Sequence, residues 1–102
     1  MPVTEMEEKD MVNEDAIELA LNDFGEYVKN TRLQLGMSLN ELADKTKLSA
    51  SFIYRLEVGQ RRALLNTRLV ILLCGFNWDK YEIMIYFGRI LKNLEDFKKV
   101  IK

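Results

Sequence analysis

The sequence predicts an all-α protein, a compact bundle of four or five helices with a long C-terminal helix. Three observations support this fold class. Apolar residues recur at steps of three and four along most of the chain, helix-capping residues precede these stretches, and glycines follow them. No segment shows the sustained alternation or the hairpin turn pair that strands require. The length of 102 residues suits a single domain.

The first helix is expected to begin after Asn13, an N-cap candidate, and to end at Gly36, a C-cap glycine. Its apolar face follows the helical spacing and consists of Ile17, Leu21, Phe24, Val28, Thr31 and Leu35. Residues 1–12 are acidic and lack this periodicity, so we expect them to form a mobile tail.

Residues 38–41 read Ser-Leu-Asn-Glu, the form of a capping box, which predicts a second helix beginning at Leu39. Ser49 is the next cap candidate and opens a helix at residues 50–58, which Gly59 ends. Two short helices that meet steeply need a small residue at their contact, and Ala43 provides one. The corner between them would be closed by the apolar residues Leu42, Leu48, Ile53 and Leu56. This pattern predicts a helix-turn-helix, whose second helix enters the major groove of DNA.

A fourth helix is expected after a cap at Asn66 or Thr67, running through Cys74 and breaking at Gly75. Cys74 lies inside an apolar run, so we expect it to be a small buried residue. A single cysteine also excludes an internal disulfide.

A fifth helix is expected from Trp78 towards Ile101, with Asn77 as its cap. It carries a heptad seam of apolar residues, Ile83, Phe87, Ile90, Leu94, Phe97 and Ile101. The seam either packs back on its own domain or forms a homodimer contact. We favour the dimer, because two-fold symmetric operators need paired recognition helices. The expected organisation is therefore an acidic tail (1–12), a DNA-binding domain (13–78) and a dimerisation helix (79–102).

The composition argues against an enzyme and against a cofactor. The chain has no histidine, which removes the commonest general base and the commonest metal ligand together. One cysteine without histidine cannot form the usual zinc sites, and no phosphate-binding glycine loop or nucleophile elbow is present. The longest apolar run, residues 69–74, is too short to span a bilayer, and the acidic start does not read as a signal peptide. We therefore expect a cytoplasmic protein without a membrane partner.

The net charge of −1 hides a strong local division. Residues 1–23 hold eight acids against one lysine, whereas residues 24–68 hold eight bases against four acids. Residues 69–102 hold six bases against four acids. A surface that binds DNA phosphates needs such local positive charge, so double-stranded DNA is the expected partner of the central segment.

Over residues 24–78 the sequence resembles the Xre-type helix-turn-helix family, which includes the phage Cro and repressor domains. The matching residues are Gly25, Arg32, Gly36-Met37-Ser38, Glu41-Leu42-Ala43, Leu48-Ser49, Ile53 and Arg55-Leu56-Glu57-x-Gly59-x-Arg61. The resemblance implies a small helical bundle that regulates transcription as a dimer on operator DNA. It also implies a structural ion pair between Arg32 and Glu57, with direct DNA contact by Arg32 a secondary role.

The chain departs from the family pattern at three positions. Leu39 stands where the family commonly has glutamine, and Ala63 replaces a frequent proline. Lys47 replaces the usual turn glycine, so a residue with a Cβ is expected to adopt a positive φ at a cost of roughly 1 kcal/mol.

Candidates for base contacts lie on the outer face of the helix at residues 50–58, and a solvated surface is the alternative for each of them. Ser51 can bond a base edge, Ala50 can touch a thymine methyl group, and Arg55 can bond guanine or a phosphate. Tyr54 can stack on sugar or bond a phosphate.

Phosphate contacts are expected from the free amides at the start of the helix that begins at Leu39. The side chains expected to contribute are Asn40, Gln60, Arg61 and Arg62, with a solvated loop as the alternative for Arg62.

The favoured function is therefore a sequence-specific regulator, a repressor rather than an activator, that binds DNA as a dimer. The alternative is a protein-interaction module on the same fold, such as an antirepressor, antitoxin or inhibitor. The apolar residues Leu39, Ala50 and Phe52 favour this alternative. The acidic tail would shield the basic face, recruit a protein partner or remain solvated.

Overall fold

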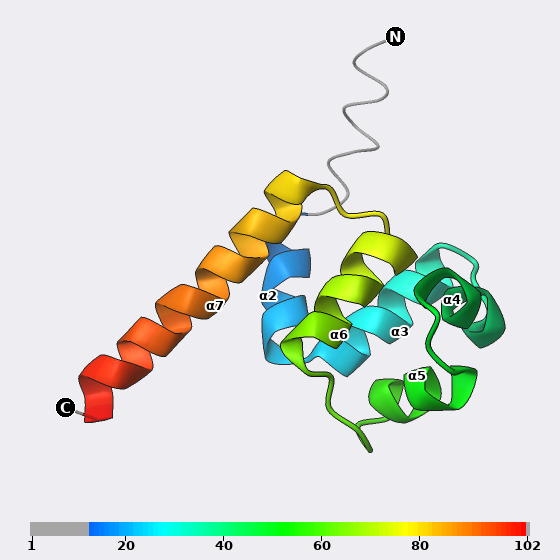
Figure 1. The fold of residues 1–102 in the computed structure, drawn as a ribbon, viewed down its shortest axis with the longest axis horizontal. Helices are drawn as coiled ribbons and strands as arrows, with labels where there is room; N and C mark the ends of the chain where they lie inside the picture. Colours follow the sequence, from blue (N-terminus) through cyan, green and yellow to red (C-terminus); the bar gives the residue numbers. More distant parts are fainter. Residues whose placement is uncertain (1–12, 102) are drawn as a thin grey trace, which may run out of the picture.

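The computed structural model describes residues 13–101, and all regular structure within this range is helical (Figure 1). This confirms the predicted all-α fold with a long C-terminal helix. The elements in chain order are α2 (Glu14–Asn22), α3 (Phe24–Gln34), α4 (Leu39–Thr46), α5 (Ala50–Glu57), α6 (Leu65–Val70), the π-helical turn η1 (Ile71–Gly75) and α7 (Lys80–Ile101). The acidic segment expected at residues 1–12 lies outside the described residues.

The prediction of a single helix between Asn13 and Gly36 is wrong, because the helix is interrupted at Asp23. This residue leaves the helical region, with φ −150° and ψ 79°. Its backbone N–H donates to the Leu19 carbonyl at 2.8 Å and ends α2, while its carboxylate accepts from the Glu26 amide at 3.2 Å and begins α3. One aspartate therefore closes one helix and caps the next.

The two helices of the predicted helix-turn-helix are confirmed. Ser38 Oγ accepts from the Glu41 amide at 3.0 Å, and Glu41 Oε1 accepts from the Ser38 amide at 2.7 Å, so the capping box is complete and α4 begins at Leu39. Ser49 Oγ accepts from the Phe52 amide at 3.1 Å and caps α5. Lys47, between them, has the predicted positive φ of 60°.

The predicted start of the fourth helix is wrong. α6 begins at Leu65, and Leu64 at its N-cap makes no side-chain capping bond. The last turn widens into η1, which places Ile71, Leu72 and Gly75 against the core. The expected burial of Cys74 is also wrong: Cys74 is exposed, because it lies on the opposite side of this turn.

The predicted start of the fifth helix is wrong by two residues. Asp79, not Asn77, caps α7: its carboxylate accepts from the Glu82 amide at 2.9 Å, and Glu82 Oε1 accepts from the Asp79 amide at 2.7 Å. Asn77 instead takes a left-handed conformation with φ 60°. Trp78 therefore precedes α7 rather than forming its first turn.

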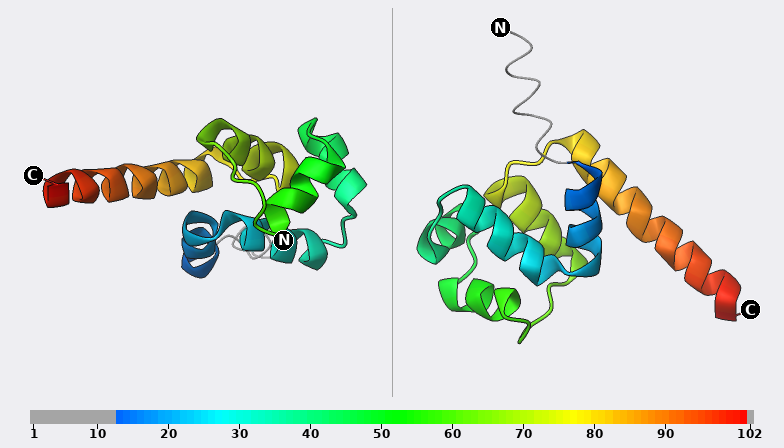
Figure 2. Two further views of the ribbon diagram at one scale, coloured as in Figure 1. Left: turned by 90° about the horizontal axis from the view of Figure 1, so that it is seen from below. Right: turned by 180° about the vertical axis from the view of Figure 1, so that it is seen from behind.

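The core draws buried residues from all of these elements except α6, which has none. Its fully buried side chains are Tyr86, Leu42, Ile53, Ile71, Leu72 and Val28. Trp78 Nε1 donates to the Tyr27 hydroxyl at 3.0 Å, and the Tyr86 hydroxyl donates to the Ala20 carbonyl at 3.2 Å. An ion pair between Arg89 and Glu18 adds a second link between α7 and α2. These contacts fix the first half of α7, while its second half extends away from the other helices in both views of Figure 2.

Candidate nucleic-acid interface

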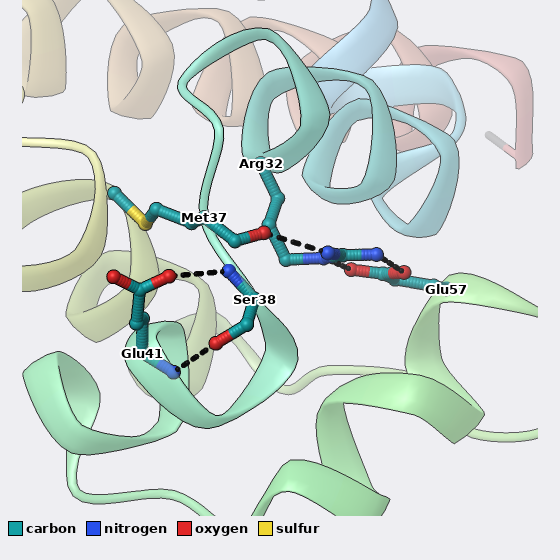
Figure 3. Close-up of polar contacts among 5 residues, drawn as sticks. All are labelled: Arg32, Met37, Ser38, Glu41 and Glu57. Carbon is teal, nitrogen blue, oxygen red and sulfur yellow. Dashed lines mark hydrogen bonds and ion pairs between the residues drawn. The ribbon is translucent and has the colours of Figure 1, made fainter.

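Arg32 and Glu57 hold α3 against α5, as the resemblance implied. Arg32 Nε lies 2.8 Å from Glu57 Oε2, and the second guanidinium bond, to Glu57 Oε1, is 3.1 Å long. A third bond, from Arg32 to the Met37 carbonyl at 2.8 Å, fixes the turn that leads into α4 (Figure 3). The hydrogen bond to Glu57 raises the pKa of Arg32 above its ordinary value. The pair is largely buried, with side chains that are only 12% and 3% exposed.

A glycine lets the same two helices approach closely. A Cβ placed on Gly25 would lie 2.2 Å from the Leu56 carbonyl oxygen, so only glycine fits at this crossing. The inner face of α5 is then buried through Ile53, Leu56 and Glu57. Because three residues of a two-turn helix are fixed in this way, the direction of its outer face is fixed as well.

The outer face of α5 carries three of the four predicted base-contacting residues. Ser51, Tyr54 and Arg55 are exposed, and 51% of Tyr54 is accessible. Ala50, the fourth, is half-buried and packs against the core.

The predicted phosphate-contacting side chains Asn40, Gln60, Arg61 and Arg62 are all exposed. Two of them follow the end of α5 directly: the Gln60 and Arg61 amides both donate to the Arg55 carbonyl, at 2.8 and 3.3 Å. The Arg61 guanidinium lies 5.9 Å from the centre of the Phe52 ring, a cation–π contact that holds it near α5. Sequence reasoning did not predict this contact.

In the sequence Arg68 is only one of the eight bases of residues 24–68, but in the fold it anchors the basic loop, residues 58–64, which connects α5 to α6. Its Nε donates to the Ala63 carbonyl at 3.1 Å, and a second guanidinium nitrogen donates to the Tyr86 hydroxyl at 3.1 Å. Its guanidinium also lies 5.3 Å from the centre of the Phe24 ring. Arg68 therefore joins the loop after α5 to both α3 and α7. The only sequence signal for this role is a charged residue set among apolar ones.

The basic loop also borders a cleft next to the start of α3. Arg61, Arg62 and Arg68 line this cleft, and among residues 13–101 Asp23 is the only acid in its wall. The surplus of positive charge in this region makes it attractive to an anion such as a DNA phosphate.

Two other kinds of site are absent from the described part of the chain. Among residues 13–101, no group of three or more cysteine, aspartate or glutamate residues is placed to hold a metal ion. Within the same range, no helix has both the length and the apolar character needed to cross a membrane.

The short helix α5 has a fixed inner face and an exposed polar face. A second short helix, α4, precedes it, and the basic loop follows it. This arrangement defines a helix-turn-helix DNA-binding domain. The sequence model of the helix-turn-helix family matches residues 28–77, about half of the chain. The protein therefore belongs to this family, of the Cro-like type that its sequence resembles. The family comprises DNA-binding regulatory domains and is not an enzyme family. Comparison with curated proteins and with solved structures gave no match.

Proposed function

We propose that this protein is a sequence-specific transcriptional repressor that inserts α5 into the major groove of operator DNA. The observation that carries the proposal is the division of α5 into a buried inner face and an outer face with Ser51, Tyr54 and Arg55 exposed. A recognition helix needs this division, since it must be fixed to its domain and still present side chains to base edges.

Each side chain on the outer face has a distinct role in the proposed complex. Arg55 bonds guanine through its two-pronged guanidinium, and Ser51 bonds a base edge. Tyr54 contacts sugar or phosphate, and the half-buried Ala50 offers its methyl group to a thymine methyl.

The phosphate contacts of the proposed complex come from both ends of the helix-turn-helix. The Ser38 hydroxyl occupies the Glu41 amide, which leaves the earlier amides of α4, beside Asn40, for a phosphate. Gln60, Arg61 and Arg62 contact the backbone at the other end of α5. Repression is consistent with these contacts, since it requires only that the protein occupy the operator.

The alternative, a protein-interaction module, loses part of its support. It was favoured by the apolar residues Leu39, Ala50 and Phe52, but all three are partly buried and pack against the core. They therefore offer less apolar surface to a partner than the sequence suggested.

The test is binding to a labelled DNA fragment from upstream of the protein's own gene, measured across a salt series. We expect affinity to fall steeply with salt, because phosphate contacts release counterions. Arg55→Ala should cost about 1–3 kcal/mol on the specific fragment and reduce discrimination against random DNA. Arg61→Ala/Arg62→Ala should weaken both fragments alike and reduce the salt slope by about 2.

Lys80→Ala, which removes one exposed base from the start of α7, is the matched control and should bind like the wild type. A folded wild-type protein that ignores both fragments at low salt would refute the proposal and favour the protein-interaction module.

A further inference from the structure

We propose that the cleft beside the start of α3 binds a small phosphate monoester, and that this ligand regulates the protein by competing with DNA for Arg61 and Arg62. Binding of the small molecule does not require DNA. Only the competition rests on the function proposed above.

The cleft lies where the basic loop and the start of α6 pass the junction of α2 and α3 (Figure 1). Arg61, Arg62 and Arg68 line it from the loop and α6, and Asp23 and Phe24 line it from the junction. Its volume is about 370 Å³, which is within the range of small-molecule sites. Most of its wall is polar, so the ligand that it fits is a small polar molecule.

Arg68 is the residue that points to an anion. Residues 13–101 contain three half-buried arginines, and two of them have a carboxylate partner. Arg32 is paired with Glu57. Arg89 is paired with Glu18. Arg68 is the third, and within the same residues it forms no ion pair, although it lies in a cleft with two further arginines.

The partners that Arg68 does have are all neutral. Its guanidinium donates to the Ala63 carbonyl and to the Tyr86 hydroxyl and lies over the Phe24 ring. Its Nη2 makes no hydrogen bond within the described residues, and it is not buried, since no buried side-chain nitrogen among them lacks a partner. A charge partly withdrawn from water is costly without an opposite charge. An anion in the cleft would meet a guanidinium that the fold already holds in place.

The charge of the cleft matches a dianion. Three guanidinium groups and one carboxylate, that of Asp23, leave the wall with a net charge of +2. A phosphate monoester carries about −1.5 to −2 near pH 7, and its oxygens accept the paired hydrogen bonds that arginine offers. A carboxylate or a phosphodiester, with one negative charge, would neutralise only half of this surplus.

The position of the cleft favours a free monoester over the DNA backbone. Leu56, from the inner face of α5, lines it, so the cleft is not part of the outer face that carries Ser51 and Tyr54. A phosphate must enter the cleft to reach the half-buried Arg68. A terminal phosphate can enter in this way, whereas a backbone phosphate is flanked by a sugar on both sides.

The regulatory consequence follows from the two arginines that both ligands would use. Arg61 and Arg62 line the cleft, and they are also the side chains proposed to contact DNA phosphates after α5. A monoester that accepts their hydrogen bonds withdraws two positive charges from the DNA-binding surface. Affinity for DNA then falls, because fewer phosphate contacts are available.

The first experiment is calorimetric titration of the full chain without DNA, near pH 7.5 and at constant ionic strength. Glycerol 3-phosphate is the probe, since it is a small monoester. We expect saturable binding with one site per chain. Dimethyl phosphate stands for the DNA backbone and should bind roughly tenfold more weakly. Glycerol, which lacks the phosphate, should not bind.

Two exposed residues of the cleft allow changes in opposite directions without disturbing the core. Arg62→Ala removes a donor and should weaken glycerol 3-phosphate binding about tenfold. Asp23→Asn removes the opposing charge and should strengthen binding several-fold, while asparagine still caps α3. Lys80→Ala, at an exposed base outside the cleft, is the matched control and should bind like the wild type.

Arg68 is tested by Arg68→Lys, which keeps the charge but loses the planar fork of the guanidinium. Glycerol 3-phosphate should bind this variant much more weakly. Circular dichroism verifies that each variant is folded. If Arg68→Lys does not fold, Arg62→Ala and Asp23→Asn still decide the matter.

The competition is tested by adding glycerol 3-phosphate to the complex with the labelled DNA fragment. DNA affinity should fall, and the half-effective concentration should match the dissociation constant measured without DNA. Asp23→Asn should respond to less glycerol 3-phosphate than the wild type does.

The outcomes separate this inference from the proposed function. Absent binding of glycerol 3-phosphate, equal binding of dimethyl phosphate, or an Asp23→Asn variant without gain would overturn the site. DNA binding that ignores a bound monoester would overturn the competition. A protein that binds glycerol 3-phosphate as expected but no DNA would overturn the proposed function and leave the site standing.

Discussion

Arg32 on α3 and Glu57 on α5 face each other through two hydrogen bonds, although 25 residues separate them in the chain. Glu57→Ala should destabilise the fold by about 3 kcal/mol, because it leaves a mostly buried guanidinium without its carboxylate. Urea unfolding measures this loss. Glu18→Ala breaks the more exposed pair with Arg89 and should cost less than about 1 kcal/mol. The double variant Arg32→Met/Glu57→Leu should recover most of the loss, and its failure to do so would contradict this reasoning.

Gly25 and Gly88 form a matched pair of helical glycines in opposite environments. Gly25→Ala should cost several kcal/mol, because its methyl group would meet the Leu56 carbonyl at 2.2 Å. Gly88→Ala should stabilise the protein by about 0.5–1 kcal/mol, since nothing lies within 4 Å and alanine favours the helix. Thermal unfolding of both variants checks the signs. Equal effects would mean that α3 and α5 can separate without cost.

Lys47 adopts the left-handed conformation, which glycine takes without strain. Lys47→Gly should therefore gain up to about 1 kcal/mol of stability, whereas Lys45→Gly, inside α4, should lose about the same amount. Denaturant unfolding separates the two outcomes. A loss in both variants would show that φ at residue 47 is not strained.

The capping box makes the stability depend on acidic pH. The backbone bond to Ser38 lowers the pKa of Glu41 below its ordinary value of 4.5. The folded state therefore favours the carboxylate, and this stabilisation is complete above pH 4.5 and is lost as the pH falls through the lowered pKa. Glu41→Gln should flatten the dependence of unfolding free energy on pH in this range. An unchanged slope, with Ser38→Ala as a second reference, would count against the cap.

The helix-turn-helix could be predicted because its signals are local. Ser38, Glu41 and Ser49 cap their own helices, and the spacing of Ile53 and Leu56 alone indicates which face of α5 is buried. The same spacing hid the break at Asp23, since apolar residues continue in step on both sides of it. The spacing of apolar residues indicates which face of a helix is buried, but it does not indicate where the helix axis changes direction.

Other features depend on tertiary packing, which no short segment encodes. Asn77 and Asp79 are both residue types that commonly cap helices. In the structure Asp79 caps α7, and Trp78 between them packs against Tyr27. Cys74 lies in a continuous apolar run that has no polar residue to mark its outer side, and the π-helical turn set its exposure. In the candidate interface, Phe52 is partly buried because it packs against the core.

The anchoring of the basic loop by Arg68 has a thermodynamic consequence. A flexible loop must surrender conformational entropy when it meets a ligand, at about 1–2 kcal/mol for each backbone residue that becomes ordered. Here the Ala63 carbonyl already accepts a hydrogen bond from Arg68, whose guanidinium also donates to the Tyr86 hydroxyl. Much of that ordering therefore occurs when the chain folds, and a nucleic acid that meets the loop encounters a surface that is already organised.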